Sequence, residues 1–223
     1  MRSFSKILGF GNLSLVFAGI FLFASTVSAT IIGGTVTGGQ ALSQGGIFIK
    51  IAPGFTDSNP DNTVGNDTFQ NPNLYGFDED QNILLAAVLN VNIGTSPIAG
   101  ETVASHYIFF DPDPSTTITG TVNFDSDVIG IITSTGLLAA SDFLINTGVT
   151  YLNPGLRGLE SGDTASISGL QQISINWRAS RPGDYIRVLT QFSPAAVPEP
   201  GTIILFGSGL MGLAAWRRFK KNT

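Results

Sequence analysis

The sequence contains a single histidine, His106, which directly follows Ser105. A serine and a histidine can act as nucleophile and general base, but a triad also needs a carboxylate partner and an oxyanion hole, which the sequence does not place. The Gly-Ser-Gly triplet at 207–209 lies inside an apolar run and does not match the strand-to-helix turn of a hydrolase nucleophile. We therefore expect His106 to be a strand histidine satisfied by hydrogen bonds, and we predict no catalytic residue.

Two pairs of carboxylates are close in sequence, Asp78 with Asp80 and Asp111 with Asp113. Two carboxylates that flank a glycosidic bond carry out glycoside hydrolysis, so a hydrolase of matrix sugars is one hypothesis. No spacing rule joins either pair into such a site, however, and we favour a protein that is not an enzyme.

Residues 57–82 are rich in oxygen ligands, with six asparagines, five aspartates and one glutamate. The start of this stretch resembles an EF-hand loop, but Asn62 stands where that loop needs glycine, and no glutamate occupies the twelfth position. A solvated, turn-rich loop is the favoured interpretation, and calcium held by scattered loop oxygens is the alternative. We predict no cofactor and assign no metal ligand.

Charge is divided unevenly along the chain. Six of the 11 basic residues lie at the two ends, whereas the other five and all 16 acidic residues lie between positions 30 and 200, so this body carries a net charge of −11. Such a surface repels nucleic acid and anionic lipid, and we expect neither as a partner of the body. The absence of cysteine excludes disulfides, thiolate metal sites and a cysteine nucleophile.

Short β-branched and aromatic segments, bounded by Gly, Pro, Asn and Asp, dominate the body and predict strands. Apolar residues alternate with polar ones in 116–124 and 171–179, which is typical of half-buried strands. The predicted fold class is all-β, an antiparallel β-sandwich of jelly-roll type, with one short helix over 135–146 that Thr135 caps. The predicted strands are 30–37, 46–52, 82–93, 102–110, 116–124, 128–135, 164–169, 171–179 and 184–192.

Six aromatic residues of the body would suit carbohydrate binding if they were exposed on a sandwich face. At strand spacing, most of them are expected to be core residues instead. They are Tyr75, Phe77, Tyr107, Tyr151, Trp177 and Tyr185.

The first 29 residues have the three parts of a secretory signal peptide: a short basic region, an apolar core and small residues that end at Ala29. We predict cleavage by signal peptidase after Ala29. The alternative is a retained N-terminal anchor helix, which is less favoured because Val27, Ser28 and Ala29 provide the small side chains that the peptidase requires.

Residues 201–216 form an uncharged apolar run, which as a helix would span about 24 Å of the roughly 30 Å bilayer core. The Arg217 and Arg218 that follow, with Lys220 and Lys221, predict that this transmembrane helix has its C-terminal end in the cytoplasm and the body outside.

The residues before this run, Pro198, Glu199 and Pro200, favour an extended peptide beside the membrane, because a proline disfavours helix at the residue before it. Together with the glycine-containing helix and the arginine-rich end, "VPEPGTIILFGSGLMGLAAWRR" resembles the PEP-CTERM sorting signal. The resemblance implies cleavage near Pro-Glu-Pro by an exosortase, in exopolysaccharide-producing Gram-negative bacteria. An ordinary tail anchor is the alternative, but it does not account for Pro-Glu-Pro.

The predicted organisation is a signal peptide (1–29), a secreted domain (30–194) and a sorting segment (195–223) with a transient membrane helix. We expect an exported structural or adhesive protein that passes the inner membrane and joins the cell surface or the extracellular polysaccharide of a biofilm. The sorting residues are Pro198, Glu199, Pro200, Arg217 and Arg218. The alternative function is a carbohydrate-binding module of the matrix, stabilised by calcium.

Overall fold

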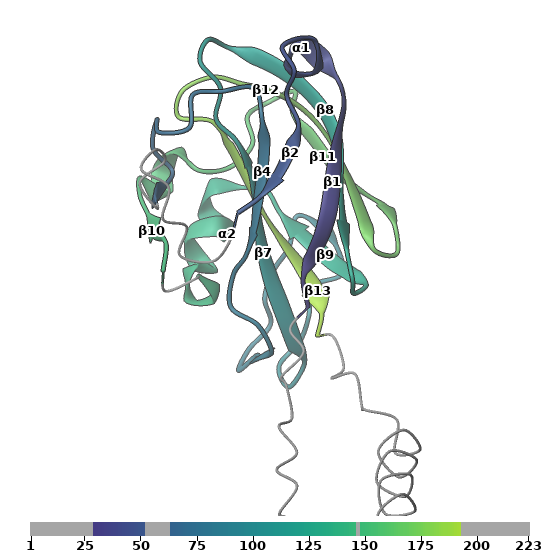
Figure 1. The fold of residues 1–223 in the computed structure, drawn as a ribbon. Coiled ribbons are helices and arrows are strands. Elements are labelled where there is room, and N and C mark those ends of the chain that lie inside the picture. Colours follow the sequence, from purple (N-terminus) through teal and green to yellow (C-terminus); the bar gives the residue numbers. More distant parts are fainter. Residues whose placement is uncertain (1–28, 52–62, 146–147, 193–223) are drawn as a thin grey trace, which may run out of the picture.

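The computed structural model describes residues 29–51, 63–145 and 148–192 (Figure 1). Most of the ordered elements in these ranges are strands in antiparallel and mixed sheets, with few helical segments, so the prediction of a mainly β body is confirmed. Within the same ranges, no helix is long and apolar enough to cross a membrane. The predicted membrane helix, the sorting residues and the signal peptide up to Ser28 lie outside the described residues.

One sheet has four antiparallel strands in the order β1-β8-β12-β11. The alternation predicted for its two central strands is confirmed, because every second residue of β8 is fully buried or nearly so. Ile118, Val122 and Phe124 of β8 all face the interior. The strands are β1 (Ile31–Gly38), β8 (Thr116–Phe124), β12 (Gln172–Ala179) and β11 (Thr164–Gly169).

The larger sheet has seven strands in the order β2-β4-β7-β13-β9-β6, with β5 also paired to β7. Its pairs are antiparallel except for β2 with β4, which is parallel. The strands are β2 (Phe48–Lys50), β4 (Leu74–Asp78), β5 (Ile83–Leu84), β6 (Ile93–Gly94), β7 (Thr102–Phe110), β9 (Val128–Ile132) and β13 (Asp184–Gln191).

The larger sheet is covered on both faces. One face packs against the four-stranded sheet through a core that includes Ile108, Val122 and Trp177. The other face packs against a cap of short elements, through a core that includes Tyr107, Leu138 and Leu189. The cap and its surroundings contain β3 (Thr63–Val64), α2 (Thr135–Ala140), η1 (Asp142–Leu144), β10 (Thr150–Tyr151) and η2 (Pro154–Leu156), whereas α1 (Gly39–Ser43) lies beside β8 (Figure 1). Both faces of β7 and β13 are therefore buried.

Three local predictions are wrong. Residues 82–93 do not form one strand, because only β5 and β6 at its two ends pair with the sheet. The helix expected over 135–146 is divided into α2 and η1, and its N-cap is Ser134, with no capping bond from a side chain. The stretch 57–82 is not loop throughout, because it contains β3 and the buried strand β4.

A buried ion pair joins the cap to the sheet. Arg187 of β13 binds Glu79, which follows β4, with Nε–Oε2 and Nη2–Oε1 distances of 2.6 and 2.8 Å. Both side chains are fully buried. The Arg187 Nη1 also donates to the Leu138 carbonyl of α2 at 3.1 Å, and Tyr151 of β10 donates to Glu79 at 2.7 Å. The guanidinium of Arg187 thus donates both to Glu79, which follows a strand of the sheet, and to a backbone carbonyl of the cap.

A second buried carboxylate, Asp184, begins β13 and is 2% exposed. Its Oδ2 atom is buried and has no hydrogen-bond partner. Burial, with smaller contributions from Asp163 and Glu160, raises the pKa of Asp184 to about 8. The carboxyl therefore keeps its proton in the folded protein at neutral pH.

We expect Glu79→Gln to destabilise the protein by about 3 kcal/mol, because the buried guanidinium of Arg187 then keeps as counter-charge only the longer contact, at 3.4 Å, to the partly exposed Asp142. Denaturant unfolding of the purified variant measures this free energy. Glu160→Gln makes the same chemical change at an exposed position and is the control, with an expected effect of at most about 0.5 kcal/mol. Equal losses in both variants would contradict the role given to the ion pair.

Asp184 makes stability depend on pH. The unfolded chain releases this proton near pH 3.9, whereas the folded chain holds it to about pH 8, so the stabilisation is complete below the first value and is lost as the pH rises through the second. Asp184→Asn should therefore raise the melting temperature at pH 8 relative to wild type by about 4 °C or more, and much less at pH 5. Asp113→Asn, at an exposed carboxylate, is the control. A difference that does not change with pH would contradict this assignment.

Candidate functional site

Both ends of the body meet at one turn. The backbone N–H of Thr30, just before β1, donates to Asp125 Oδ1 at 2.7 Å, and Asp125 N–H donates to the Thr30 carbonyl at 3.0 Å. At the other end of the chain, Gln191 N–H donates to the Asp127 carbonyl at 2.9 Å. We call Thr30, Asp125, Asp127 and Gln191 the terminal pole, which lies at the lower end of the body in Figure 1. The first and the last described residues of the body therefore lie close to the same turn.

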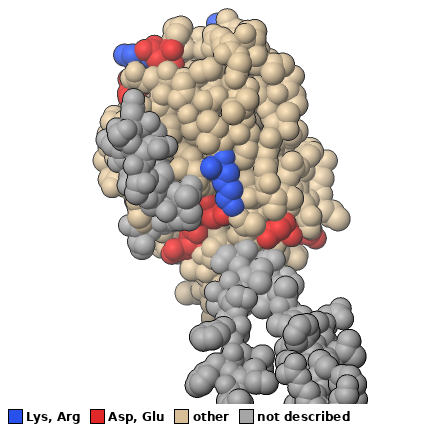
Figure 2. Space-filling view, in the orientation of Figure 1, with Lys and Arg blue, Asp and Glu red and all other residues tan. Residues whose placement is uncertain are grey.

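Asp78, at the end of β4, fixes the start of β1 at this pole. Its Oδ2 accepts from Thr30 Oγ1 at 2.6 Å, and its Oδ1 accepts from Ile31 N–H at 2.9 Å. Lys50 Nζ lies 2.8 Å from Oδ2. Burial opposes ionisation of Asp78, but hydrogen bonds and charge from His106, followed by Lys50 and Thr30, outweigh it and hold the pKa of this carboxyl well below its usual value. Figure 2 shows acidic side chains at the lower end of the body and another group of them at its upper left.

The structure gives His106 a carboxylate and a hydroxyl, as a catalytic triad would. The Nδ1 atom lies 2.8 Å from Asp78 Oδ1, and Nε2 lies 3.0 Å from Thr190 Oγ1. Both His106 and Thr190 are fully buried, and the imidazole packs against Phe124 of the facing sheet at 5.0 Å between ring centroids. The line of three groups joins β4, β7 and β13 inside the body and presents no hydroxyl to a substrate. This arrangement agrees with the expectation of a histidine satisfied by hydrogen bonds.

The other sequence-based site residues are not brought together. Ser105 faces away from His106 and donates to Glu79 Oε2 at 2.5 Å. Asp111 is buried and accepts from the N–H groups of Thr68 and Phe69 at 3.1 and 3.0 Å, whereas Asp113 pairs with Arg181. Burial is the main reason that the pKa of Asp111 is raised to about 6. Asp111 and Asp113 thus serve different partners.

No group of three or more Asp, Glu or His side chains in the described ranges is placed to hold a metal ion. The start of the asparagine-rich stretch, residues 57–62, lies outside those ranges. The calcium alternative is therefore untested for that segment.

The aromatic residues considered for carbohydrate binding are mostly in the cores. Tyr151 is partly buried, and its ring lies 5.7 Å from the guanidinium carbon of Arg157. The other five are buried, namely Tyr75, Phe77, Tyr107, Trp177 and Tyr185. These six side chains provide no exposed platform for a sugar, as expected from their strand spacing.

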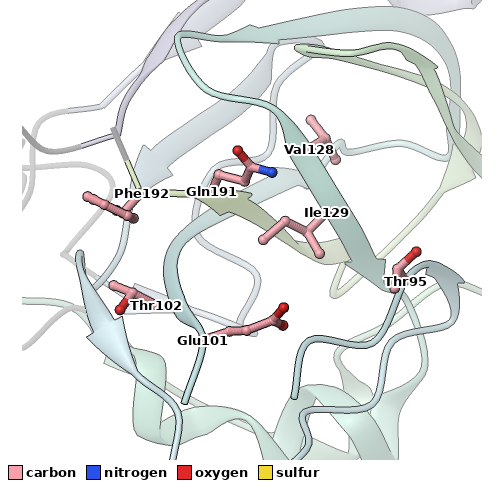
Figure 3. Close-up of a pocket in the computed structure, with 7 residues that line it drawn as sticks. All are labelled: Thr95, Glu101, Thr102, Val128, Ile129, Gln191 and Phe192. Carbon is pink, nitrogen blue, oxygen red and sulfur yellow. The ribbon is translucent and has the colours of Figure 1, made fainter. Parts of the chain in front are cut away.

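A recess of about 630 Å³ opens beside the terminal pole (Figure 3). Its wall contains the exposed ring of Phe192 and the apolar side chain of Ile129, together with the carboxylate of Glu101 and the amide of Gln191. The other lining residues are Thr95, Thr102 and Val128. Sequence analysis missed this recess, because its residues come from four separate segments. The only local signal is Phe192, an aromatic residue that directly follows β13 and is 46% exposed.

Comparison with known proteins finds one feature outside the described residues. Residues 196–218 match the family model described as the PEP-CTERM protein-sorting motif, and the predicted residues Pro198, Glu199, Pro200, Arg217 and Arg218 all fall inside the match. No curated protein and no solved structure matches the chain. The chain therefore carries a PEP-CTERM protein-sorting signal, which implies export and processing by an exosortase.

Proposed function

We propose that this protein is a non-enzymatic, surface- or exopolysaccharide-associated protein with a structural or adhesive role. Signal peptidase removes residues 1–29, an exosortase-type protease cuts near Pro198 to Gly201, and the body is released to the cell surface or the matrix. The sorting motif at 196–218 is the observation that carries this proposal. A jelly-roll sandwich over 30–194 is the domain that we propose for the released product.

Two features of the body support this route. Its two ends lie at one pole, so both cleavage segments can face the same membrane while the rest of the body points away from it. The polar groups that resemble catalytic machinery are the buried His106 and Thr190 and the partly buried Asp78, and their hydrogen bonds join strands. A stable, passive body fits a role in a matrix.

The processing step is tested by determining both ends of the protein released from its native host. We expect a chain that begins at Thr30 and ends near Val197 to Gly201 by intact mass and peptide mapping. The double variant Pro198→Ala with Pro200→Ala should keep the C-terminal peptide and stay in the membrane fraction, because it removes the extended segment offered to the protease. Pro194→Ala, which lies outside the matched motif, should behave as wild type. A wild-type product that retains "LAAWRRFKKNT" would refute the proposal.

A second candidate function is carbohydrate binding at the recess beside the terminal pole. The observation that favours it is the pairing of one exposed aromatic ring, Phe192, with the polar side chains of Glu101 and Gln191 in a hollow of about 630 Å³. An aromatic ring can stack on the apolar face of a sugar, while carboxylate and amide groups bind its hydroxyls.

Phe192→Ala should then weaken binding of the processed protein to polysaccharide isolated from the same host by about ten-fold, because it removes the stacking surface. Phe143→Ala removes another exposed ring, on η1, and should leave binding unchanged. Retention of the protein on immobilised polysaccharide gives the affinity. Binding that is absent in wild type, or equally reduced in both variants, would rule out this second function.

A further inference from the structure

We propose that hydrolysis of the bond between Ala29 and Thr30 makes the new α-ammonium group of Thr30 an ion partner of Asp125 within the fold. This inference rests on the export step of the proposed function and goes beyond it, because it gives the mature amino terminus a defined place and partner. Asp125 is separated from Thr30 by the whole length of β1 to β8 in the sequence, so the contact is tertiary.

The nitrogen of Thr30 is already in position in the uncut chain. It lies 2.7 Å from Asp125 Oδ1, and the Thr30 carbonyl accepts from Asp125 N–H at 3.0 Å. The Thr30 hydroxyl and the Ile31 N–H both donate to Asp78, at 2.6 and 2.9 Å. Two carboxylates therefore hold three successive polar groups at the start of β1, which fixes the position of the nitrogen that hydrolysis would free.

The local charges leave room for one more cation. Lys50 Nζ also donates to the Thr30 hydroxyl and to the Ile31 carbonyl, so one cation already lies beside Thr30. It is 2.8 Å from Asp78 Oδ2, and these two charges offset each other. Asp125 Oδ1 accepts from Thr30 N–H and from Ser126 Oγ, and it has no cationic partner among the described residues. In the uncut chain, the contact from Thr30 to Asp125 is thus a neutral amide donating to a carboxylate.

In the processed chain, an ion pair takes the place of this contact. One water molecule is consumed, the carboxylate forms on Ala29, and the nitrogen of Thr30 becomes an amine that is protonated at neutral pH. A charge-assisted hydrogen bond between this ammonium and Asp125 is stronger than the amide contact that it replaces.

The fold also sets the order of events. Ala29 is fully buried in the uncut chain, and the nitrogen of Thr30 is engaged by Asp125. Proteases cut exposed segments, so the bond must be hydrolysed before β1 docks against β8. The ion pair then forms as the strand closes, which makes the docked amino terminus a product of correct processing.

The reactivity of primary amines tests the proposal. Between positions 30 and 200 the chain has one lysine, Lys50, so the fully processed protein has two primary amines. Protein released by the native host would be treated with a limiting amount of an N-hydroxysuccinimide ester of acetic acid at pH 7, and acetylation of each amine followed by peptide mass spectrometry. Wild type would be compared with Asp125→Asn and with Asp127→Asn, which removes the neighbouring carboxylate without touching the bond to Thr30.

We expect the Thr30 amine to react roughly five-fold faster in Asp125→Asn than in wild type, since loss of the ion pair frees the unprotonated amine, and at the wild-type rate in Asp127→Asn. A mature chain that starts at another residue would overturn the proposal, as would equal Thr30 rates in wild type and Asp125→Asn. Neither result bears on surface sorting, which is read separately from the C-terminal peptide. A wild-type chain released with its sorting peptide intact would instead refute the proposed function and leave the Thr30 result standing.

Discussion

The body is organised around a sheet that must be covered on both faces. Strands β7 and β13 lie at its centre and bury nearly every side chain, so a layer on one face of the sheet is not enough to cover them. The four-stranded sheet covers one face with an aliphatic and aromatic core, and the cap of short elements covers the other. The cap brings backbone carbonyls and carboxylates to that face. Arg187 of the sheet lies against them, and its guanidinium donates both to Glu79 and to the Leu138 carbonyl of α2.

This two-sided burial explains which elements could be predicted from sequence. β8 and β12 have one face on the core and one toward solvent, so their alternation of apolar and polar residues marks them clearly. β4 could not be predicted from the sequence, because it is five residues long and lies in a stretch dominated by asparagine and aspartate. Residues 82–93 are apolar enough to predict a strand, but only their ends find partners at the sheet. Strand pairing depends on residues that are distant in the sequence, so a local pattern of residues cannot predict it.

The same distinction applies to the site. The sorting signal could be recognised because its residues are contiguous and act through local conformation and charge. The terminal pole could not, because Thr30 and Asp125 are 95 positions apart. Nor could the hydrogen-bonded line of Asp78, His106 and Thr190, because its three members come from three different strands. A hydrogen-bonded role could be predicted for the single histidine, because the sequence does not place the other parts of a catalytic triad. Nothing in the sequence indicates which carboxylate binds this histidine.

The adjacency of the two ends has a topological consequence. Since the first and last described strands are held by one turn, a short peptide could join them without separating either sheet, and new ends could be opened at a distant surface turn such as that at Gly45. The body is thus suited to circular permutation and to insertion as a unit into a loop of another protein. Because the two ends are adjacent at the terminal pole, packing of the two cores does not depend on where the chain begins and ends.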